Sequence, residues 1–181
     1  LAADFKEQLG IHKTPRSKAA EIEYGIRHHI KIMIDDDPEY YKTLSKRLED
    51  LIQKHAEKWD ELVQVLMDFR DDIEKKRAQG AADLGLTETE YAFHSILVAE
   101  ITRLNGDESL DENTHDTVKE VTQSLVRMLD DASQVVDFFK KFDEQKTVKK
   151  NIKRMIIKHF DLSLVRPVTN RFMDLAQRKF K

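Results

Sequence analysis

The sequence contains no cysteine, few glycines and prolines, and no long apolar run. Without cysteine, the 181-residue chain has no disulfide, no thiolate nucleophile and no zinc–thiolate site. Its five glycines and three prolines leave few turns for a β-rich fold and favour an all-α one. No apolar stretch approaches the roughly 18 to 20 residues that span a bilayer, and the N-terminus does not resemble a signal peptide. We therefore expect a cytoplasmic helical protein that is neither secreted nor inserted in a membrane.

Charge divides the chain into an acidic body and a basic tail. Residues 1–139 contain 18 Lys and Arg against 30 Asp and Glu, whereas residues 140–181 contain 13 against 4. The net charges are −12 and +9, and the positive tail indicates an anionic partner or an acidic protein surface. We expect a single helical domain over residues 1–181, with an acidic body at 14–139 and a basic helical lobe at 140–181. Since the chain does not begin with methionine, we also expect it to be a piece of a longer polypeptide.

Capping signals predict where several helices begin and end. Thr14 and Pro15 are typical of a helix start, and Thr87 with Glu90 forms the pattern of a capping box. The other expected features are a turn at 80–85, helices at about 111–130 and 143–160, a break at 166–167 and a last helix at 169–179. The apolar run at 135–139 is either a buried turn or a strand-like connector, because periodicity does not distinguish the two.

An apolar stripe predicts one long helix over about 38–79. Its residues recur at 3.6 per turn, which favours a bundle helix over a coiled coil. We expect Trp59, in the middle of this stripe, to pack in the core. The stripe consists of Leu44, Leu48, Leu51, His55, Trp59, Leu62, Leu66, Phe69 and Ile73.

A series of short segments occurs in the same order as in one protein family. The segments are residues 17–30, 36–41, 57–62, 85–93, 148–154, 166–169 and 172–176. On these segments, residues 14–180 resemble the C-terminal helical region of the restriction (R, or HsdR) subunit of type I restriction-modification enzymes.

The resemblance implies a non-catalytic assembly domain. The parent subunit would be an ATP-dependent type I site-specific deoxyribonuclease, a hydrolase with a nuclease domain and a DNA-translocating motor. ATP and Mg would bind only in those missing domains, so we expect no cofactor in this chain. The implied partners are the methyltransferase and specificity subunits, onto which the domain would dock the motor and nuclease. In agreement, the sequence has no Gly-x-x-x-x-Gly-Lys-Ser/Thr phosphate loop. It also lacks the Asp-Glu box (the DEAD-box type of motif) of helicase motors.

The basic segment near the C-terminus supplies most of the candidate site residues. On a helical wheel they lie opposite an apolar face that contains Val148 and Ile152. A charged face is often only solvated, but an exposed Ile157 among cations is typical of a partner interface. DNA phosphate and an acidic protein surface both remain candidate partners, so an independent nucleic-acid-binding module is the alternative function. The candidate residues are Lys150, Lys153, Arg154, Ile157 and Lys158.

Two histidines and one acidic motif raise the question of a metal site. His28 and His29 are adjacent in a helix and project about 100° apart, so they are poorly placed to share one ion. Glu112 and His115 match the Glu-x-x-His unit of di-iron bundles, but such a site needs two copies. A metal-dependent enzyme is therefore only a rival hypothesis, and we expect no metal. We expect His29 at the core edge, and the resemblance favours Arg27 and His28 as interface residues.

Overall fold

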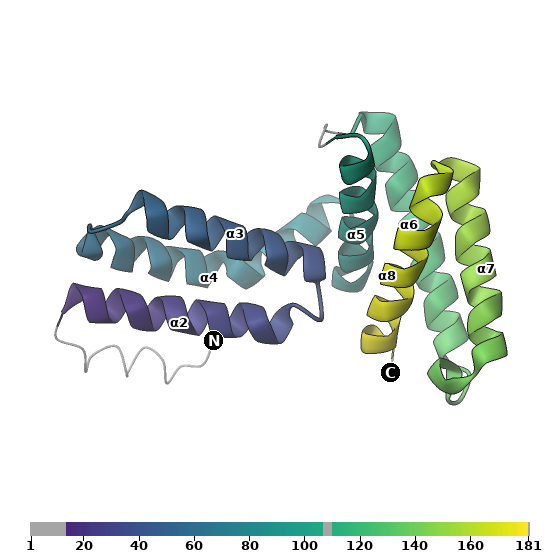
Figure 1. Cartoon of the computed structure of the whole chain (residues 1–181), viewed down its shortest axis with the longest axis horizontal. Coiled ribbons are helices and arrows are strands. Elements are labelled where there is room, and N and C mark those ends of the chain that lie inside the picture. The colour runs from purple at the N-terminus through teal and green to yellow at the C-terminus, as the bar shows by residue number, and fades with distance from the viewer. Residues whose placement is uncertain (1–13, 107–109, 181) are drawn as a thin grey trace. The chain divides into compact units, whose positions relative to one another are not determined.

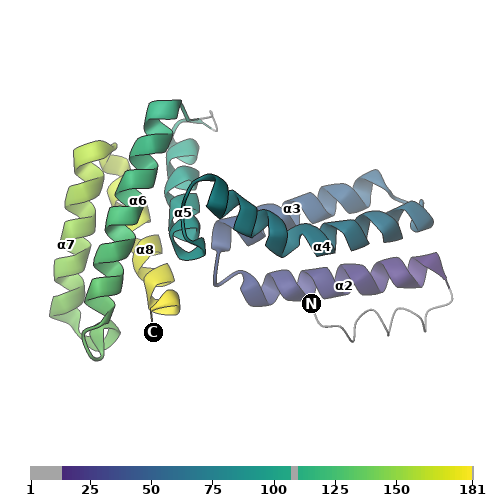
Figure 2. The ribbon, with the colours of Figure 1, turned by 180° about the vertical axis from the view of Figure 1, so that it is seen from behind.

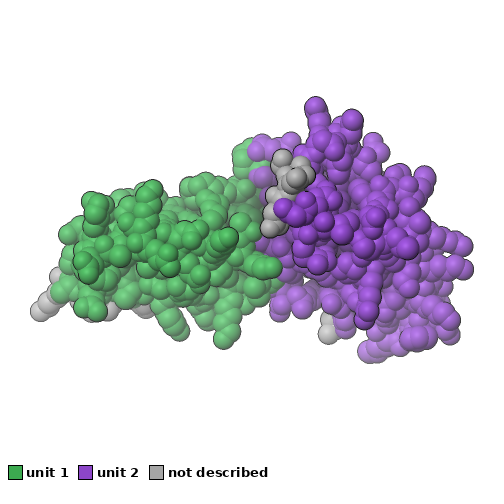
Figure 3. All heavy atoms as spheres, turned by 45° about the horizontal axis from the view of Figure 1, so that its top comes forward, with its two compact units in different colours: residues 1–34, 40–79 green, residues 35–39, 80–181 purple. Residues whose placement is uncertain are grey.

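The computed structural model describes residues 14–106 and 110–180. Over these ranges the chain forms seven α-helices, two 3-10 helices and no strand, which confirms the all-α prediction (Figure 1). It divides into two compact units: unit 1 comprises residues 1–34 and 40–79, and unit 2 comprises residues 35–39 and 80–181 (Figure 3). The change of charge at residue 140 therefore lies inside unit 2. That the chain works as a single domain stays a prediction.

Unit 1 is built from three helices that lie side by side (Figures 1 and 2). They are α2 (Pro15–Met33), α3 (Pro38–Lys54) from residue 40 onward, and α4 (Trp59–Asp83) up to residue 79. As predicted, Thr14 caps α2: its side chain accepts a hydrogen bond from the Ser17 N–H, and Pro15 follows it. One core gathers the apolar faces of all three helices. It contains Ala19, Ile22, Ile26, Ile30, Tyr41, Leu44, Leu48, Leu62, Leu66 and Ile73.

Residues 55–58 form a turn, so the single long helix predicted over 38–79 is wrong. Glu57 has a φ of 67°, a left-handed conformation that no α-helix contains. The chain folds back at this turn, and Leu48 of α3 and Leu66 of α4 pack in the same core. The regular spacing of apolar residues continues across the turn because each helix turns its apolar residues toward that core. Periodicity alone therefore did not reveal the break.

Trp59 is the first residue of α4 and is 37% exposed, so the prediction that it packs in the core is also wrong. The turn places its ring at the end of the helix. There the guanidinium carbon of Arg16 lies 5.4 Å from the ring centroid, which is cation–π distance.

We expect Trp59→Ala to lower the free energy of unfolding by less than about 1 kcal/mol, the usual strength of an exposed cation–π contact. The matched comparison is Leu66→Ala, at a fully buried position in the same helix, which should cost about 2 to 5 kcal/mol. Urea unfolding followed by circular dichroism measures both. A loss of 3 kcal/mol or more for Trp59→Ala would instead indicate a buried ring.

Polar side chains also connect the three helices of unit 1. Glu74 of α4 lies 2.9 Å from Nε2 of His29 on α2, and it accepts a hydrogen bond of 3.0 Å from the Tyr41 hydroxyl on α3. Burial, followed by this hydrogen bond, raises the pKa of Tyr41. The Tyr40 hydroxyl donates to the Ile73 carbonyl at 2.6 Å. The predicted position of His29 at the core edge is thus confirmed, and its ring takes part in joining the helices.

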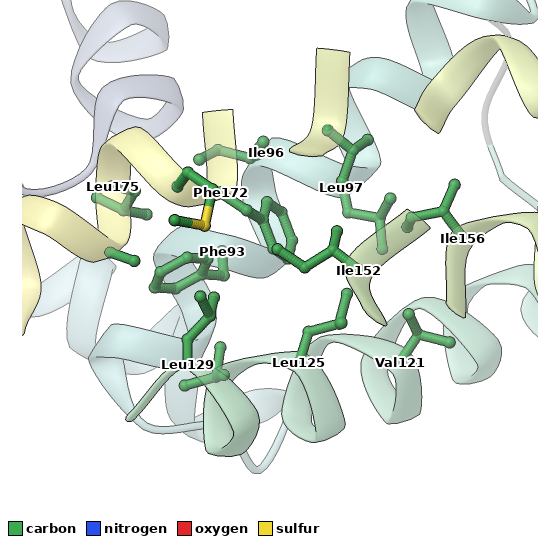
Figure 4. Close-up of a cluster of buried hydrophobic side chains, with 14 of the residues drawn as sticks. Phe93, Ile96, Leu97, Val121, Leu125, Leu129, Ile152, Ile156, Phe172 and Leu175 are labelled. Atoms are coloured by element: carbon green, nitrogen blue, oxygen red, sulfur yellow. The ribbon is translucent and has the colours of Figure 1, made fainter. Parts of the chain in front are cut away.

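Unit 2 is a four-helix bundle. Its helices are α5 (Glu88–Leu104), α6 (Glu112–Ser133), α7 (Phe142–His159) and α8 (Val165–Lys179), and the 3-10 helices are η1 (Phe138–Lys140) and η2 (Leu162–Leu164). Each α-helix packs on the next and α8 packs on α5, which closes the ring. The core between them is drawn in Figure 4. Its largest fully buried side chains include Phe93, Leu125, Leu129 and Phe172.

The capping box predicted at the start of α5 is confirmed. The Glu90 N–H donates to the Thr87 hydroxyl, and the Glu90 carboxylate accepts from the Thr87 N–H at 2.8 Å. The turn predicted over 80–85 is shorter than expected because α4 continues through Gly80 to Asp83. The chain reverses instead at Gly85, whose φ of 61° suits glycine.

Two other segments differ from or refine the predictions. The apolar run at 135–139 is a turn that leads into η1, with Phe138 buried. The break predicted at 166–167 is wrong, because α8 begins at Val165 and includes Pro167. A proline fits in the first turn of a helix, where its missing N–H has no partner within the helix.

Candidate interaction surface

The orientation of α7 is set by its buried face. Val148, Ile152 and Ile156 are buried in the core of unit 2, at intervals of four residues. Asp143 and Glu144 lie in the first turn, and cations end the helix, a distribution that complements the helix dipole. Since the apolar face is fixed in the bundle, the opposite face of α7 is turned outward.

That outward face carries a row of five exposed residues, which we call the α7 stripe. The positions are separated by four, four, three and four residues and therefore share one side of the helix. Phe142 and Ile157, the apolar residues at its two ends, are 76% and 53% exposed. The three lysines between them are also exposed. The α7 stripe consists of Phe142, Lys146, Lys150, Lys153 and Ile157.

The five candidate residues on α7 do not all lie on this stripe. Lys150, Lys153 and Ile157 do, and the predicted exposure of Ile157 is confirmed. Arg154 and Lys158 lie to one side, where they line a groove of about 660 Å³ that α7 forms with α6. The α6 wall of this groove consists of Glu120, Val121, Ser124 and Met128. The cations predicted as one set are thus divided between two neighbouring surfaces.

The other two candidate residues belong to α2, in unit 1. Nε of Arg27 donates to Glu23 at 2.9 Å, and its guanidinium lies 3.7 Å from Glu49. Its charge is therefore balanced within the chain. His28 is exposed and stacks on Tyr24 with 6.2 Å between ring centroids. Neither residue is in the compact unit that contains α7.

Ion pairs distinguish α8 from α7 within the basic tail. Arg171 binds both Glu39 and Glu100, the latter at 2.9 Å. Arg178 and Lys179 bind Asp35 and Asp36 at 2.8 and 3.0 Å. All these partners belong to unit 2. Most of the positive charge on α8 is therefore neutralised by carboxylates that are distant in the sequence.

The cations of α7 have no such partners. In the described ranges, none of its lysines, nor Arg154, forms an ion pair. The neighbouring Lys140 does, with Asp137 at 2.8 Å. Within the basic tail, the positive charge that remains available to a partner is thus concentrated on α7.

Glu100 shows how strongly a paired carboxylate is held in unit 2. Its burial would raise its pKa, but hydrogen bonds from Arg103 and Arg171 outweigh that effect and keep the pKa below its ordinary value. Glu100 is therefore a buried structural anion, and its interactions occupy Arg171. This pairing supports a structural role for α8 and leaves α7 as the candidate surface.

Sequence reasoning missed Phe142 and left Lys146 out of the candidate residues. For Phe142 the cause was the helix boundary: with a predicted start at residue 143, this residue fell in the connector. The signal was nevertheless present, because Phe142 is four residues before Lys146 and fifteen before Ile157. Extending the helical wheel by one residue would have placed it on the same face as Ile157.

The described residues also bear on the metal and membrane expectations. Within 14–106 and 110–180, no group of three or more His, Asp or Glu is arranged to hold a metal ion. Asp111 caps α6, whereas Glu112 is exposed at its start. In the same ranges, no helix combines the length and the apolar character needed to cross a membrane. The absence of a metal stays a prediction.

The fold and the α7 surface are those of a helical protein with an exposed basic and apolar face. The chain belongs to the family described as "Type I restriction enzyme HindI endonuclease subunit-like, C-terminal", which matches residues 1–176. This confirms the family resemblance seen in the sequence.

A relative in Methanocaldococcus jannaschii is named "Putative type I restriction enzyme MjaIXP endonuclease subunit". It is 27% identical to this chain over 176 residues, an alignment that covers 89% of the chain and 16% of the relative. The chain thus corresponds to a small part of that protein's length. No solved structure matches the chain.

Proposed function

We propose that this chain is a non-catalytic assembly domain of the endonuclease subunit of a type I restriction enzyme, located in the cytoplasm. Its role would be to dock the subunit's ATP-dependent motor and nuclease onto the methyltransferase and specificity subunits. Its family supports the endonuclease-subunit part of the proposal. The observation that carries the docking part is the α7 stripe, an exposed face with unpaired cations and apolar ends.

The proposal assigns the chemistry to other parts of the subunit. The sequence has no phosphate-binding loop, and the described acidic and histidine side chains form no metal-binding group. ATP and Mg would therefore bind in the motor and nuclease domains. The contribution of this chain would be positional, since it would keep those domains beside the DNA bound by the specificity subunit.

The purified 181-residue chain is expected to bind a complex of the methyltransferase and specificity subunits and to hydrolyse no ATP. Native gels or mass photometry measure the binding, and phosphate release measures the hydrolysis. An excess of the chain should also compete with the full-length endonuclease subunit and slow DNA cleavage by the assembled enzyme. If the chain neither binds the complex nor competes, the docking role is wrong.

A second candidate function is direct nucleic-acid binding through α7. The unpaired cations of this helix favour DNA binding. Lys and Arg that contact phosphates release counterions from DNA, and this release strengthens binding. The distinguishing measurement is the affinity of the chain for duplex DNA at several salt concentrations. Tight binding that weakens steeply with salt, without binding to the methyltransferase complex, would replace docking by this function.

A further inference from the structure

We infer that the α7 stripe is a two-anchor docking face for an acidic protein surface, with Phe142 and Ile157 as the apolar anchors. The inference rests on the proposed docking function and specifies its surface and its partner chemistry. The anchors are fifteen residues apart, which is about 22 Å along an α-helix. The three lysines occupy roughly the middle 10 Å of that distance.

The apolar ends of the stripe are the first argument. Single exposed apolar residues are common on protein surfaces, but these two share one helix face and flank the same lysine row. Further exposed apolar residues occur just before and just after the helix: Val136 precedes α7, and Leu162 follows it. Exposed aromatic and aliphatic side chains of this kind are typical anchors of a protein interface, where a few buried residues supply most of the binding energy.

The charge of the three lysines indicates which side chains a partner carries between its two apolar contacts. Carboxylates neutralise Arg171, Arg178 and Lys179 on α8. Lys146, Lys150 and Lys153 have no such partner among the described residues. Their long apolar stems can lie along a partner while their ammonium groups reach its surface. A complementary partner therefore presents acidic side chains opposite the lysines and apolar depressions opposite the anchors.

A protein fits this pattern better than the phosphate backbone of DNA. Phosphates would attract the three lysines, but they offer nothing apolar to Phe142 or Ile157. The apolar ends thus decide between the two classes of partner.

The test uses the full-length endonuclease subunit and the complex of methyltransferase and specificity subunits. Three variants are compared with the wild type: the double substitution Phe142→Ala with Ile157→Ala, the triple substitution of Lys146, Lys150 and Lys153 by Gln, and the control Leu104→Ala. Leu104 is an exposed apolar residue at the end of α5, away from α7 in the sequence. Thermal melting establishes that each variant is folded.

We expect the double anchor substitution to weaken binding to the complex by at least about 30-fold, because each anchor should behave as an interface hot spot. The lysine substitutions should mainly slow association and reduce its dependence on salt. Leu104→Ala should bind like the wild type. None of the variants should gain affinity for a non-specific DNA duplex.

Three results would overturn this inference without affecting the proposed docking function. Unchanged binding of a folded double anchor variant would remove the α7 stripe from the interface and leave the docking function standing. Loss of DNA affinity in the lysine variant, with intact binding to the complex, would assign the stripe to nucleic acid. If the wild-type subunit forms dimers, and the anchor substitutions dissociate them without weakening binding to the complex, a second copy of the subunit occupies the α7 stripe. If the wild-type subunit itself fails to bind the complex, the proposed function and this inference both fail.

Discussion

Replacing Phe172 by alanine is expected to lower the free energy of unfolding of unit 2 by about 3 to 5 kcal/mol, the usual cost of removing a buried aromatic ring. The side chain is fully buried in α8 and meets Phe93 of α5 edge to face, with ring centroids 5.0 Å apart. Figure 4 shows both rings within the core, near Leu125 and Leu129 of α6. The substitution therefore opens a cavity and also removes a favourable aromatic pair. Urea unfolding followed by circular dichroism measures the loss.

Phe142→Ala is the matched control, because it makes the same chemical change at an exposed position in the same unit. Exposed substitutions usually change stability by less than about 0.5 kcal/mol. A loss of less than 1 kcal/mol for Phe172→Ala would contradict the described core. A large loss for Phe142→Ala would show that this residue has a structural role and would weaken its assignment as an anchor.

The stability of unit 2 is expected to fall by about 3 kcal/mol between pH 7 and pH 4 through His94 alone. This α5 side chain is 5% exposed, and its Nε2 has no hydrogen-bond partner in the described part of the chain. Burial, and then the charges of His115 and Lys119 on α6, lower the pKa of His94 to about 4 from its ordinary value of 6.5. Protons therefore bind the unfolded chain first as the pH falls. The resulting loss of stability begins near pH 6.5, and about 2 kcal/mol of this loss occurs above pH 5.

His94→Gln removes this titration, so the variant should lose about 2 kcal/mol less than the wild type between pH 7 and pH 5. Restricting the comparison to that range avoids most of the carboxylate titrations. His28→Gln makes the same chemical change at an exposed position and is the control for the substitution itself. Parallel stability curves for His94→Gln and the wild type would show that His94 is hydrated or has a partner in solution.

Sequence reasoning was most successful where the governing interactions are local. A cap acts within three or four residues, so Thr14 and the pair Thr87 and Glu90 could be identified from their neighbours. It failed at residues 55–58, where the chain turns with neither glycine nor proline. Glu57 adopts the left-handed conformation there, and only packing of α3 against α4 gives a reason for it.

The candidate site shows the same division. The basic character of α7 and the exposure of Ile157 could be predicted, because both follow from helical periodicity. The grouping of the residues could not: Arg154 and Lys158 line a groove with α6, and contacts between helices decide that. Phe142 was lost for a smaller reason, a helix boundary that was wrong by one residue.

The sequence by itself determined the helical class, the positions of the main caps, the family and the basic charge of the C-terminal region. These properties depend on composition and on patterns that repeat within a few residues. Only the tertiary structure decided which of the positive charges is available. Glu39 and Glu100 reach Arg171 across 132 and 71 residues of sequence, and no periodicity records such a pairing. Because ion pairing depends on distances in the folded chain, the neutralisation of α8 and the free cations of α7 could be recognised only there.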